Sequence, residues 1–374
     1  MTNDDRRIGV RCDGGPRMGV GHILRQLALA EELRSRRIGV TLLGRVEGSG
    51  LVDRLLAAHG LTMVPVDAGP AALLTEVRRR RLDAVMLDGY QLPVDLGAAL
   101  RGAGVPVAAM VDGVFGLHQD ADLYIDQNLG AVRPAAVPAD RRFLAGIEYA
   151  LLRDIVRSRR GRIGRGRTGR VGAEPVGTAR GETGDLAGPA GETRDPVSPR
   201  LLCVFGGTDA YGAAPTVVSL LLGTAAPLEV VVVAGREQIA AELAGLPLGP
   251  GQRLDVVAPV DDLPGLAAGC DGVVSAAGTS VWEFFCLGLP TALVAVTANQ
   301  LVGYQAVLGT GLVAPVGQLD DLRDDPSARA AATEVLRRFT TDRTWRDGLG
   351  ARGAALVDGD GRVRVVDAIL ELIG

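Results

Sequence analysis

The segment from Arg11 to Arg25, RCDGGPRMGVGHILR, contains the residues best suited to do chemistry. Glycines such as Gly19 and Gly21 let the backbone approach a ligand closely, and the helix that follows offers free amide groups to an anion. His22 falls in the first turn of that helix, where a neutral imidazole can accept a proton from water or from a sugar hydroxyl. The segment therefore predicts a substrate-binding turn with His22 as a general base and Arg25 as a binding side chain.

A dinucleotide-binding loop is the competing interpretation of this segment. Gly19 and Gly21 match the first two glycines of such a loop, and Arg45 follows the next predicted strand, where it could contact a 2′-phosphate. Leu24 stands where the third glycine of the loop is expected, so the match is weak.

Three carboxylates and a tyrosine follow predicted strands in the N-terminal half. Asp13 lies in RCDGG, Asp88 and Tyr90 lie in LDGYQ, and Asp112 lies in VDG. Acids at strand ends can orient a sugar or assist a base, although each taken singly is more often a turn or cap residue. We expect these four residues to join His22 in a catalytic site.

A second turn, SAAGTSVWE from Ser275 to Glu283, has the pattern of a nucleotide site. A predicted strand ends in small residues, and a helix begins at Thr279 or Ser280. Hydroxyls and amides at a helix N-terminus suit a diphosphate. Glu283 lies about one turn into the helix, where its carboxylate could hold ribose hydroxyls. The alternative is an ordinary helix cap with an acidic first turn, which is common.

These segments are positioned by short β-rich runs that alternate with helical patterns. We expect strands at 8–12, 40–43, 61–64, 84–87, 105–110 and 123–125, and again at 201–205, 228–233, 254–257, 272–275 and 291–294. Strand followed by helix, repeated, predicts parallel doubly wound sheets. The expected fold is α/β, with two Rossmann-like domains at 1–156 and 200–374 that face a ligand-binding cleft.

The stretch 157–199 separates the two patterns and is rich in Arg, Gly, Pro and Thr. It has too few large apolar residues to form a core, so we expect a disordered interdomain linker. Its first third is basic, which leaves contact with an anionic partner as the alternative.

The composition excludes several classes of function. A formal net charge of -4 gives no overall basic field to hold nucleic acid. All 40 basic residues are arginine, which excludes a lysine Schiff base and a Walker-type lysine. The four cysteines lack CxxC spacing, and no apolar run approaches the ~20 residues of a membrane span. We expect buried thiols and a cytoplasmic protein that needs no metal.

Taken together, these segments resemble the PseG/SpsG family, which comprises UDP-sugar hydrolases of the pseudaminic acid pathway and glycosyltransferase-like proteins of spore-coat polysaccharide synthesis. Further matching stretches are DADLYIDQN, LAGIEYALLR, FGGTD, SAAGTSVWEFFCLGLP and an Asn-Gln pair. The resemblance implies the GT-B architecture, no metal, and a histidine, here His22, that in the hydrolases activates the water attacking the anomeric carbon. We expect no cofactor. It places the nucleotide on a set of C-terminal residues: Gly207, Thr208, Gly278, Thr279, Ser280, Glu283, Asn299 and Gln300. The chain departs from the family pattern at Gly113, where a second acid is common, and at Ala277.

The resemblance leaves three functions open. We expect first a hydrolase that cleaves the anomeric C–O bond of a nucleotide sugar, taken as a UDP-sugar, and releases UDP. The alternative is an inverting GT-B glycosyltransferase that uses the same donor, because both activities share the cleft, the histidine and the nucleotide loop. A non-catalytic nucleotide-sugar-binding protein is the third. The expected partner is the small-molecule nucleotide sugar, with other enzymes of a sugar pathway as further candidates.

Overall fold

Two parallel β-sheets form the framework of the chain. The computed structural model describes residues 3–15, 21–46, 50–112, 116–161, 198–207 and 209–374. A seven-stranded sheet has the order β3-β2-β1-β4-β5-β6-β7, and a six-stranded sheet has the order β10-β9-β8-β11-β12-β13. Neighbouring strands pair in parallel in both. The predicted pair of doubly wound α/β domains is therefore confirmed.

The N-terminal sheet holds the first seven strands, and helices cross between them. The strands are β1 (Arg7–Cys12), β2 (Gly39–Leu43), β3 (Met63–Val64), β4 (Ala84–Asp88), β5 (Val107–Met110), β6 (Leu123–Asp126) and β7 (Arg142–Ala145). The helices are η1 (Asn3–Asp5), α1 (Gly21–Ser35), α2 (Gly50–Ala58), α3 (Pro70–Arg80), α4 (Leu96–Gly102), η2 (Ile147–Tyr149) and α5 (Asp154–Arg157). β7 is an additional edge strand that the sequence pattern did not predict. Its four residues are all half-buried, so they show no alternation of apolar and polar positions.

The C-terminal sheet is built in the same way. Its strands are β8 (Arg200–Val204), β9 (Leu228–Val233), β10 (Gln252–Val257), β11 (Gly272–Ala276), β12 (Thr291–Ala295) and β13 (Ala314–Gln318). Its helices are α6 (Ala213–Leu222), α7 (Glu237–Ala244), α8 (Leu263–Ala268), α9 (Ser280–Leu287), η3 (Ala298–Gln300), α10 (Leu301–Val307), α11 (Leu319–Asp324), α12 (Pro326–Thr341) and α13 (Arg343–Leu356). β13 was also not predicted. It contains Pro315 and a register shift, both typical of an edge strand.

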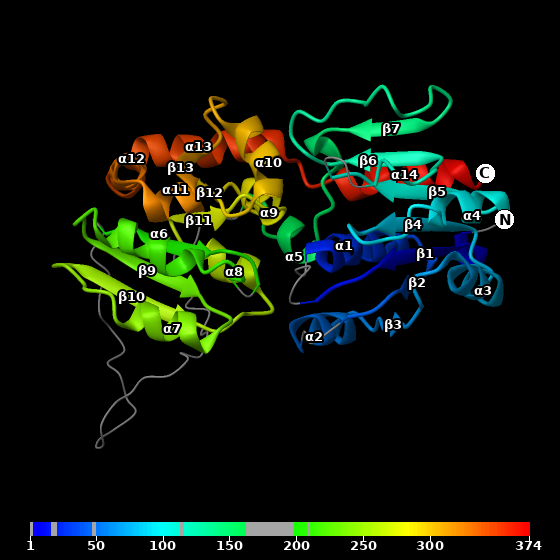
Figure 1. Cartoon of the computed structure of the whole chain (residues 1–374), viewed down its shortest axis with the longest axis horizontal. Helices are drawn as coiled ribbons and strands as arrows, with labels where there is room; N and C mark the ends of the chain where they lie inside the picture. Colours follow the sequence, from blue (N-terminus) through cyan, green and yellow to red (C-terminus); the bar gives the residue numbers. More distant parts are fainter. Residues whose placement is uncertain (1–2, 16–20, 47–49, 113–115, 162–197, 208) are drawn as a thin grey trace, which may run out of the picture.

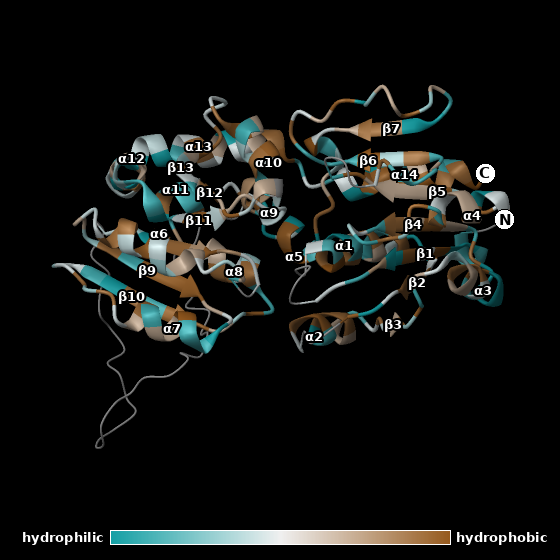
Figure 2. Ribbon diagram, in the orientation of Figure 1, coloured by the Kyte–Doolittle hydropathy of each residue, from teal (hydrophilic) through white to brown (hydrophobic). Residues whose placement is uncertain are grey.

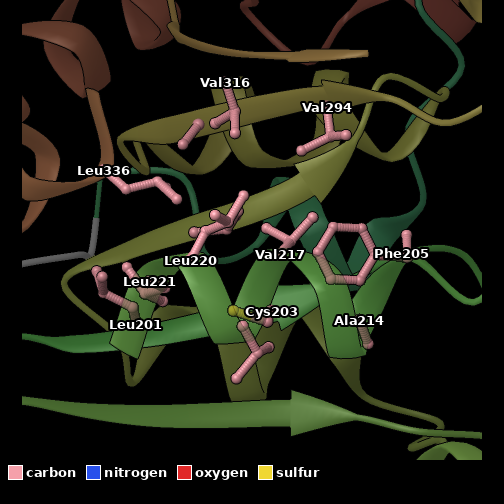
Figure 3. Close-up of a cluster of buried hydrophobic side chains, with 14 of the residues drawn as sticks. Leu201, Cys203, Phe205, Ala214, Val217, Leu220, Leu221, Val294, Val316 and Leu336 are labelled. Carbon is pink, nitrogen blue, oxygen red and sulfur yellow. The ribbon is translucent and has the colours of Figure 1, made fainter. Parts of the chain in front are cut away.

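Apolar side chains are buried on both faces of each sheet. Figure 2 shows strands such as β4 and β9 in the brown of hydrophobic residues. Alternate residues of β8 show the burial on both faces directly. Leu201 and Cys203 pack with α6 on one face, as Figure 3 shows, whereas Leu202 and Val204 belong to the core on the other. Strands buried on both faces read as continuous apolar runs, which is why the central strands could be predicted.

The last helix, α14 (Gly361–Leu372), packs against the N-terminal sheet. Val365, Val366 and Ile369 are buried in the same core as Leu27 of α1. The predicted boundary of 200–374 had placed this helix with the C-terminal domain. We propose instead that it belongs to the N-terminal domain, because its apolar face is buried there. Most of the predicted linker, 162–197, lies outside the described residues.

The carboxyl ends of the strands of both sheets point toward one another (Figure 1). As a result, the N-termini of α1 and α9 come close together. A Cβ atom placed on Gly21 would lie 3.3 Å from the Thr279 hydroxyl oxygen. Arg54 of α2 also reaches the opposite domain, with its Nη2 atom 2.8 Å from Asp261 Oδ1. The two turns singled out in the sequence therefore face each other.

Candidate functional site

Three side chains of α1 converge on one carboxylate, that of Asp88 at the carboxyl end of β4. His22 Nδ1 lies 2.7 Å from Asp88 Oδ1, while Arg25 Nε and Gln26 Nε2 donate to Asp88 Oδ2 over 2.6 and 2.7 Å. Positions i, i+3 and i+4 share one face of a helix, so the first turn of α1 presents all three together. The group is buried, with His22 6% and Asp88 1% exposed.

The carboxylate of Asp88 fixes the proton on the His22 ring. Burial alone would raise the pKa of Asp88, but the charges and hydrogen bonds of Arg25 and His22 hold this pKa below its usual range. An ionised carboxylate can only accept, so the proton of the contact must sit on His22 Nδ1. Arg25 Nη2 lies 2.8 Å from the same nitrogen because both donate to Asp88 Oδ1. In the neutral ring, this tautomer leaves a lone pair on His22 Nε2 that can accept a proton.

Tyr90 and Asp112 extend the group along the sheet edge. The rings of Tyr90 and His22 meet edge to face, with centroids 4.5 Å apart. The Tyr90 hydroxyl donates to Asp112 Oδ2, and burial together with the Asp112 charge raises the pKa of Tyr90. Asn128 Nδ2 lies 2.9 Å from Asp126 Oδ1 and 3.4 Å from Asp112 Oδ1. The ends of β4, β5 and β6 thus supply a row of polar groups beside the imidazole.

Asp13 has other partners. Its Oδ1 atom lies 2.6 Å from Arg11 Nη1 and accepts from the backbone amide of Arg45 over 2.8 Å. No hydrogen bond joins Asp13 to His22 within the described part of the chain. Asp13 therefore links the Arg11 side chain to the backbone that follows β2. The Arg45 side chain, on which the 2′-phosphate alternative depended, pairs with Asp67.

The second turn leaves backbone donors available at the start of α9. Thr279 is the N-cap of this helix, and its side chain makes no capping hydrogen bond. Among the described residues, no backbone acceptor is bonded by the amides of Thr279 and Ser280. Gln300 borders the turn, since a Cβ atom on Gly278 would lie 3.9 Å from its Nε2 atom. Free amides at a helix N-terminus can bind an anion.

Glu283 is held by an arginine from the segment between the domains. Arg153 Nη2 lies 3.0 Å from Glu283 Oε1, and Arg153 Nε lies 3.3 Å from the same oxygen. Both side chains are buried. The sequence placed Arg153 only at the end of a matching stretch, because nothing in its spacing shows a partner 130 residues away.

The loop after β8 has a different arrangement from the loop after β11. The carboxylate of Asp209 accepts from the amides of Ala213 and Ala214 over 2.8 and 2.9 Å. The N-terminus of α6 is thus already capped, whereas the Thr279 and Ser280 amides at the start of α9 have no acceptor in the part of the chain that the structure describes. Gly207 lies in the loop and is half-buried.

Three of the predicted binding residues cannot be placed in full. Gly19 and Thr208 lie outside the described residues. Asn299 lies within η3, but its side chain is not described. The remaining predicted binding residues lie in the two facing turns, in the loop after β8 or beside Asp88.

Several broader features bear on the kind of site. All four cysteines are buried, as predicted. Over the described ranges, no group of three His, Cys, Asp or Glu side chains is arranged to hold a metal ion. A search of the same residues finds no helix with the length and apolar character needed to cross a membrane.

Known proteins resemble the chain in sequence and in structure, although no family model matches it. SpsG of Bacillus subtilis (strain 168), a spore coat polysaccharide biosynthesis protein, is 21% identical over 98% of both chains. A UDP-N-acetylglucosamine–N-acetylmuramyl-(pentapeptide) pyrophosphoryl-undecaprenol N-acetylglucosamine transferase of Sorangium cellulosum (strain So ce56) is 30% identical, over 96% of this chain and 85% of the relative.

Solved structures share the fold. MurG of Acinetobacter baumannii superposes with a TM-score of 0.61 at 17% identity, covering 98% of this chain and 99% of that one. A UDP-GlcNAc 2-epimerase of Neisseria meningitidis, bound to UDP-GlcNAc, gives 0.63 at 12% identity, covering 98% and 100%. These findings confirm the SpsG resemblance and the GT-B type of fold. The chain therefore belongs to the family of GT-B proteins that includes SpsG and the N-acetylglucosamine transferase of Sorangium cellulosum.

Proposed function

We propose that this protein is an inverting glycosyltransferase that uses a UDP-sugar as donor, with His22 as the general base. The observation that carries the proposal is the buried His22–Asp88 pair, which lies at a turn that faces the start of α9. Among the described residues, His22 Nε2 has no hydrogen-bond partner. The transferase alternative has better support than the expected hydrolase, because the relative at 30% identity is a transferase.

The reaction needs one proton acceptor and one leaving group. His22 Nε2 takes the proton of an acceptor hydroxyl, whose oxygen attacks the anomeric carbon of the donor sugar. The bond from that carbon to the diphosphate oxygen breaks, and UDP leaves with the bonding electrons. Attack from the face opposite UDP inverts the anomeric configuration. Asp88 stabilises the imidazolium that forms, since its charge lies 2.7 Å from Nδ1.

The nucleotide is assigned to the C-terminal domain. The diphosphate would accept from the open amides of Thr279 and Ser280, where the helix dipole also favours negative charge. The Glu283 carboxylate would accept from the ribose hydroxyls. Uridine is the favoured nucleoside because the epimerase structure with this fold holds UDP-GlcNAc and the transferase relative is named for it.

The test separates transfer from hydrolysis by the need for an acceptor. The protein is incubated with UDP-GlcNAc, and free UDP is measured. The reactions contain no acceptor, the lipid-linked N-acetylmuramyl-pentapeptide for which the Sorangium cellulosum transferase is named, or one of a panel of sugar acceptors. We expect acceptor-dependent UDP release that is lost in His22→Asn. Release at one rate with or without any acceptor would identify a hydrolase and contradict the proposal. Calorimetry with UDP tests the nucleotide assignment without turnover.

A further inference from the structure

We propose that Arg153 is a positioning residue that sets the preference of the nucleotide site for ribose over 2′-deoxyribose. Arg153 would act through Glu283 and would not touch the nucleotide itself. The inference rests on the proposed function, in which the Glu283 carboxylate accepts from the ribose hydroxyls.

The geometry of the pair leaves part of the carboxylate available. Arg153 directs Nε and Nη2 at Glu283 Oε1 over 3.3 and 3.0 Å. Within the described ranges, Oε2 has only a longer contact of 3.4 Å with Nη2. A carboxylate has about four acceptor positions, so those on Oε2 can still receive hydroxyl donors. A planar guanidinium with two donors on one oxygen also restricts rotation of the carboxylate, which a single ammonium would not do.

Both members of the Arg153–Glu283 ion pair are buried. Arg153 is 3% exposed and Glu283 is 8% exposed. A buried charge needs a partner, so each side chain holds the other in place. Solvent cannot substitute for the guanidinium if it is removed.

The backbone around Arg153 is tied to the helix that carries the base. The amide of Asp154 donates to Glu31 Oε2 on α1 over 2.6 Å. Arg362 of α14 donates to the same Glu31 oxygen over 2.7 Å and to the Leu152 carbonyl over 3.4 Å. Figure 1 shows the short helix α5 between α9 and α1. The Glu283 carboxylate is therefore oriented relative to the helix that bears His22.

The consequence is a specific loss when Arg153 is replaced. A 2′-hydroxyl bonded to a fixed carboxylate should favour UDP over 2′-deoxyUDP by about 10- to 100-fold, the range for a hydrogen bond to a charged group. A carboxylate that can rotate offers no fixed acceptor, so the ratio falls while the diphosphate and base contacts remain. A purely structural role would weaken the binding of both nucleotides equally.

The experiment measures the dissociation constants of UDP and 2′-deoxyUDP by calorimetry. The full chain is compared with Arg153→Lys, Arg153→Met and the control Arg157→Met, which removes a nearby arginine that pairs with Asp154 and Asp360 and not with Glu283. The quantity compared is the dissociation constant of 2′-deoxyUDP divided by that of UDP. We expect this ratio to approach 1 in Arg153→Met and to stay unchanged in the control. In Arg153→Lys it should fall at least about threefold, because lysine has one donor group where the guanidinium directs two.

The outcomes separate the two proposals. If Arg153→Met does not fold, Arg153→Lys decides, since it keeps the buried charge paired. A wild-type ratio retained by Arg153→Lys would overturn the inference and leave the ribose assignment standing. If the wild-type protein itself binds UDP and 2′-deoxyUDP equally, the ribose assignment of the proposed function is wrong, and the inference fails with it.

Discussion

Replacing Asp88 by asparagine keeps the size of the side chain and removes only its charge and one acceptor. The carboxylate now receives His22 Nδ1 and Arg25 Nη2 on Oδ1, and Arg25 Nε and Gln26 Nε2 on Oδ2. An amide oxygen would turn to the Arg25 Nε and Gln26 donors, which places its NH2 group against His22 Nδ1. Two hydrogen bonds to a charged group are then lost, at about 1.5 to 3 kcal/mol each. The expected destabilisation is about 3 to 6 kcal/mol, close to the usual cost of about 3 to 5 kcal/mol for removing one member of a buried pair.

The same rotation has a catalytic consequence. An NH2 group opposite Nδ1 makes this nitrogen an acceptor and moves the imidazole proton to Nε2, so His22 can no longer act as a base. Loss of a positioned base lowers kcat by about 10²- to 10⁴-fold. The assays are acceptor-dependent UDP release, UDP affinity by calorimetry and denaturant unfolding. Asp13→Asn is the matched control, because Asp13 is a strand-end acid paired with an arginine but not bonded to His22. A folded Asp88→Asn protein with kcat within threefold of wild type would refute the reasoning.

Three further predictions follow from the same contacts. His22→Asn should lower kcat by about 10²- to 10⁴-fold with the calorimetric UDP affinity nearly unchanged, and a matching loss of affinity would argue against a role as base. The pKa of Asp88 is lowered in the folded protein, so its stabilisation is complete above the ordinary aspartate pKa of about 3.9 and is lost as pH falls below it. The difference in unfolding free energy between wild type and Asp88→Asn should therefore shrink as the pH falls below about 3.9, and a difference that grows there would contradict the assignment. Gly21→Val should force the turn away from Thr279 and reduce kcat/KM about 100-fold, whereas Gly102→Ala, with open space around it, should leave kcat/KM unchanged.

Much of the fold could be predicted because the central strands are apolar on both faces and are separated by turn residues. Two of the four edge strands, β7 and β13, could not. β7 is only half-buried, and β13 contains Pro315. The position of α14 was also beyond the sequence, since an amphipathic helix shows that it packs but not on which sheet.

The residues of the candidate site also fall into those that the sequence could reveal and those that it could not. The sequence brought forward His22, Asp88, Tyr90 and Asp112 because all lie at strand ends or helix starts, and the structure places them in contact in a row. Gln26 could have been found, since it lies four residues after His22 on one helix face. The contact of Arg153 could not be predicted, because its partner Glu283 lies 130 residues away in the sequence. The contacts of Asp13 could not be predicted either, because its partners are the Arg11 side chain and the backbone amide of Arg45, which follows β2.

The return of α14 to the N-terminal domain means that the chain passes between the domains twice. Leu151 lies in the core beside α1, while Leu152 lies in the core of the other domain, and the chain crosses back between Val357 and Val365. Arg157 Nη2 lies 2.6 Å from Asp360 Oδ1, so the two crossings are tied side by side. A body attached at two points turns about the line through them, whereas one attached at a single point can swing in any direction. The start of α9 is therefore held opposite the start of α1 with fewer directions of relative movement than a single crossing would leave, and Arg54 and Asp261 pair between the two domains as well.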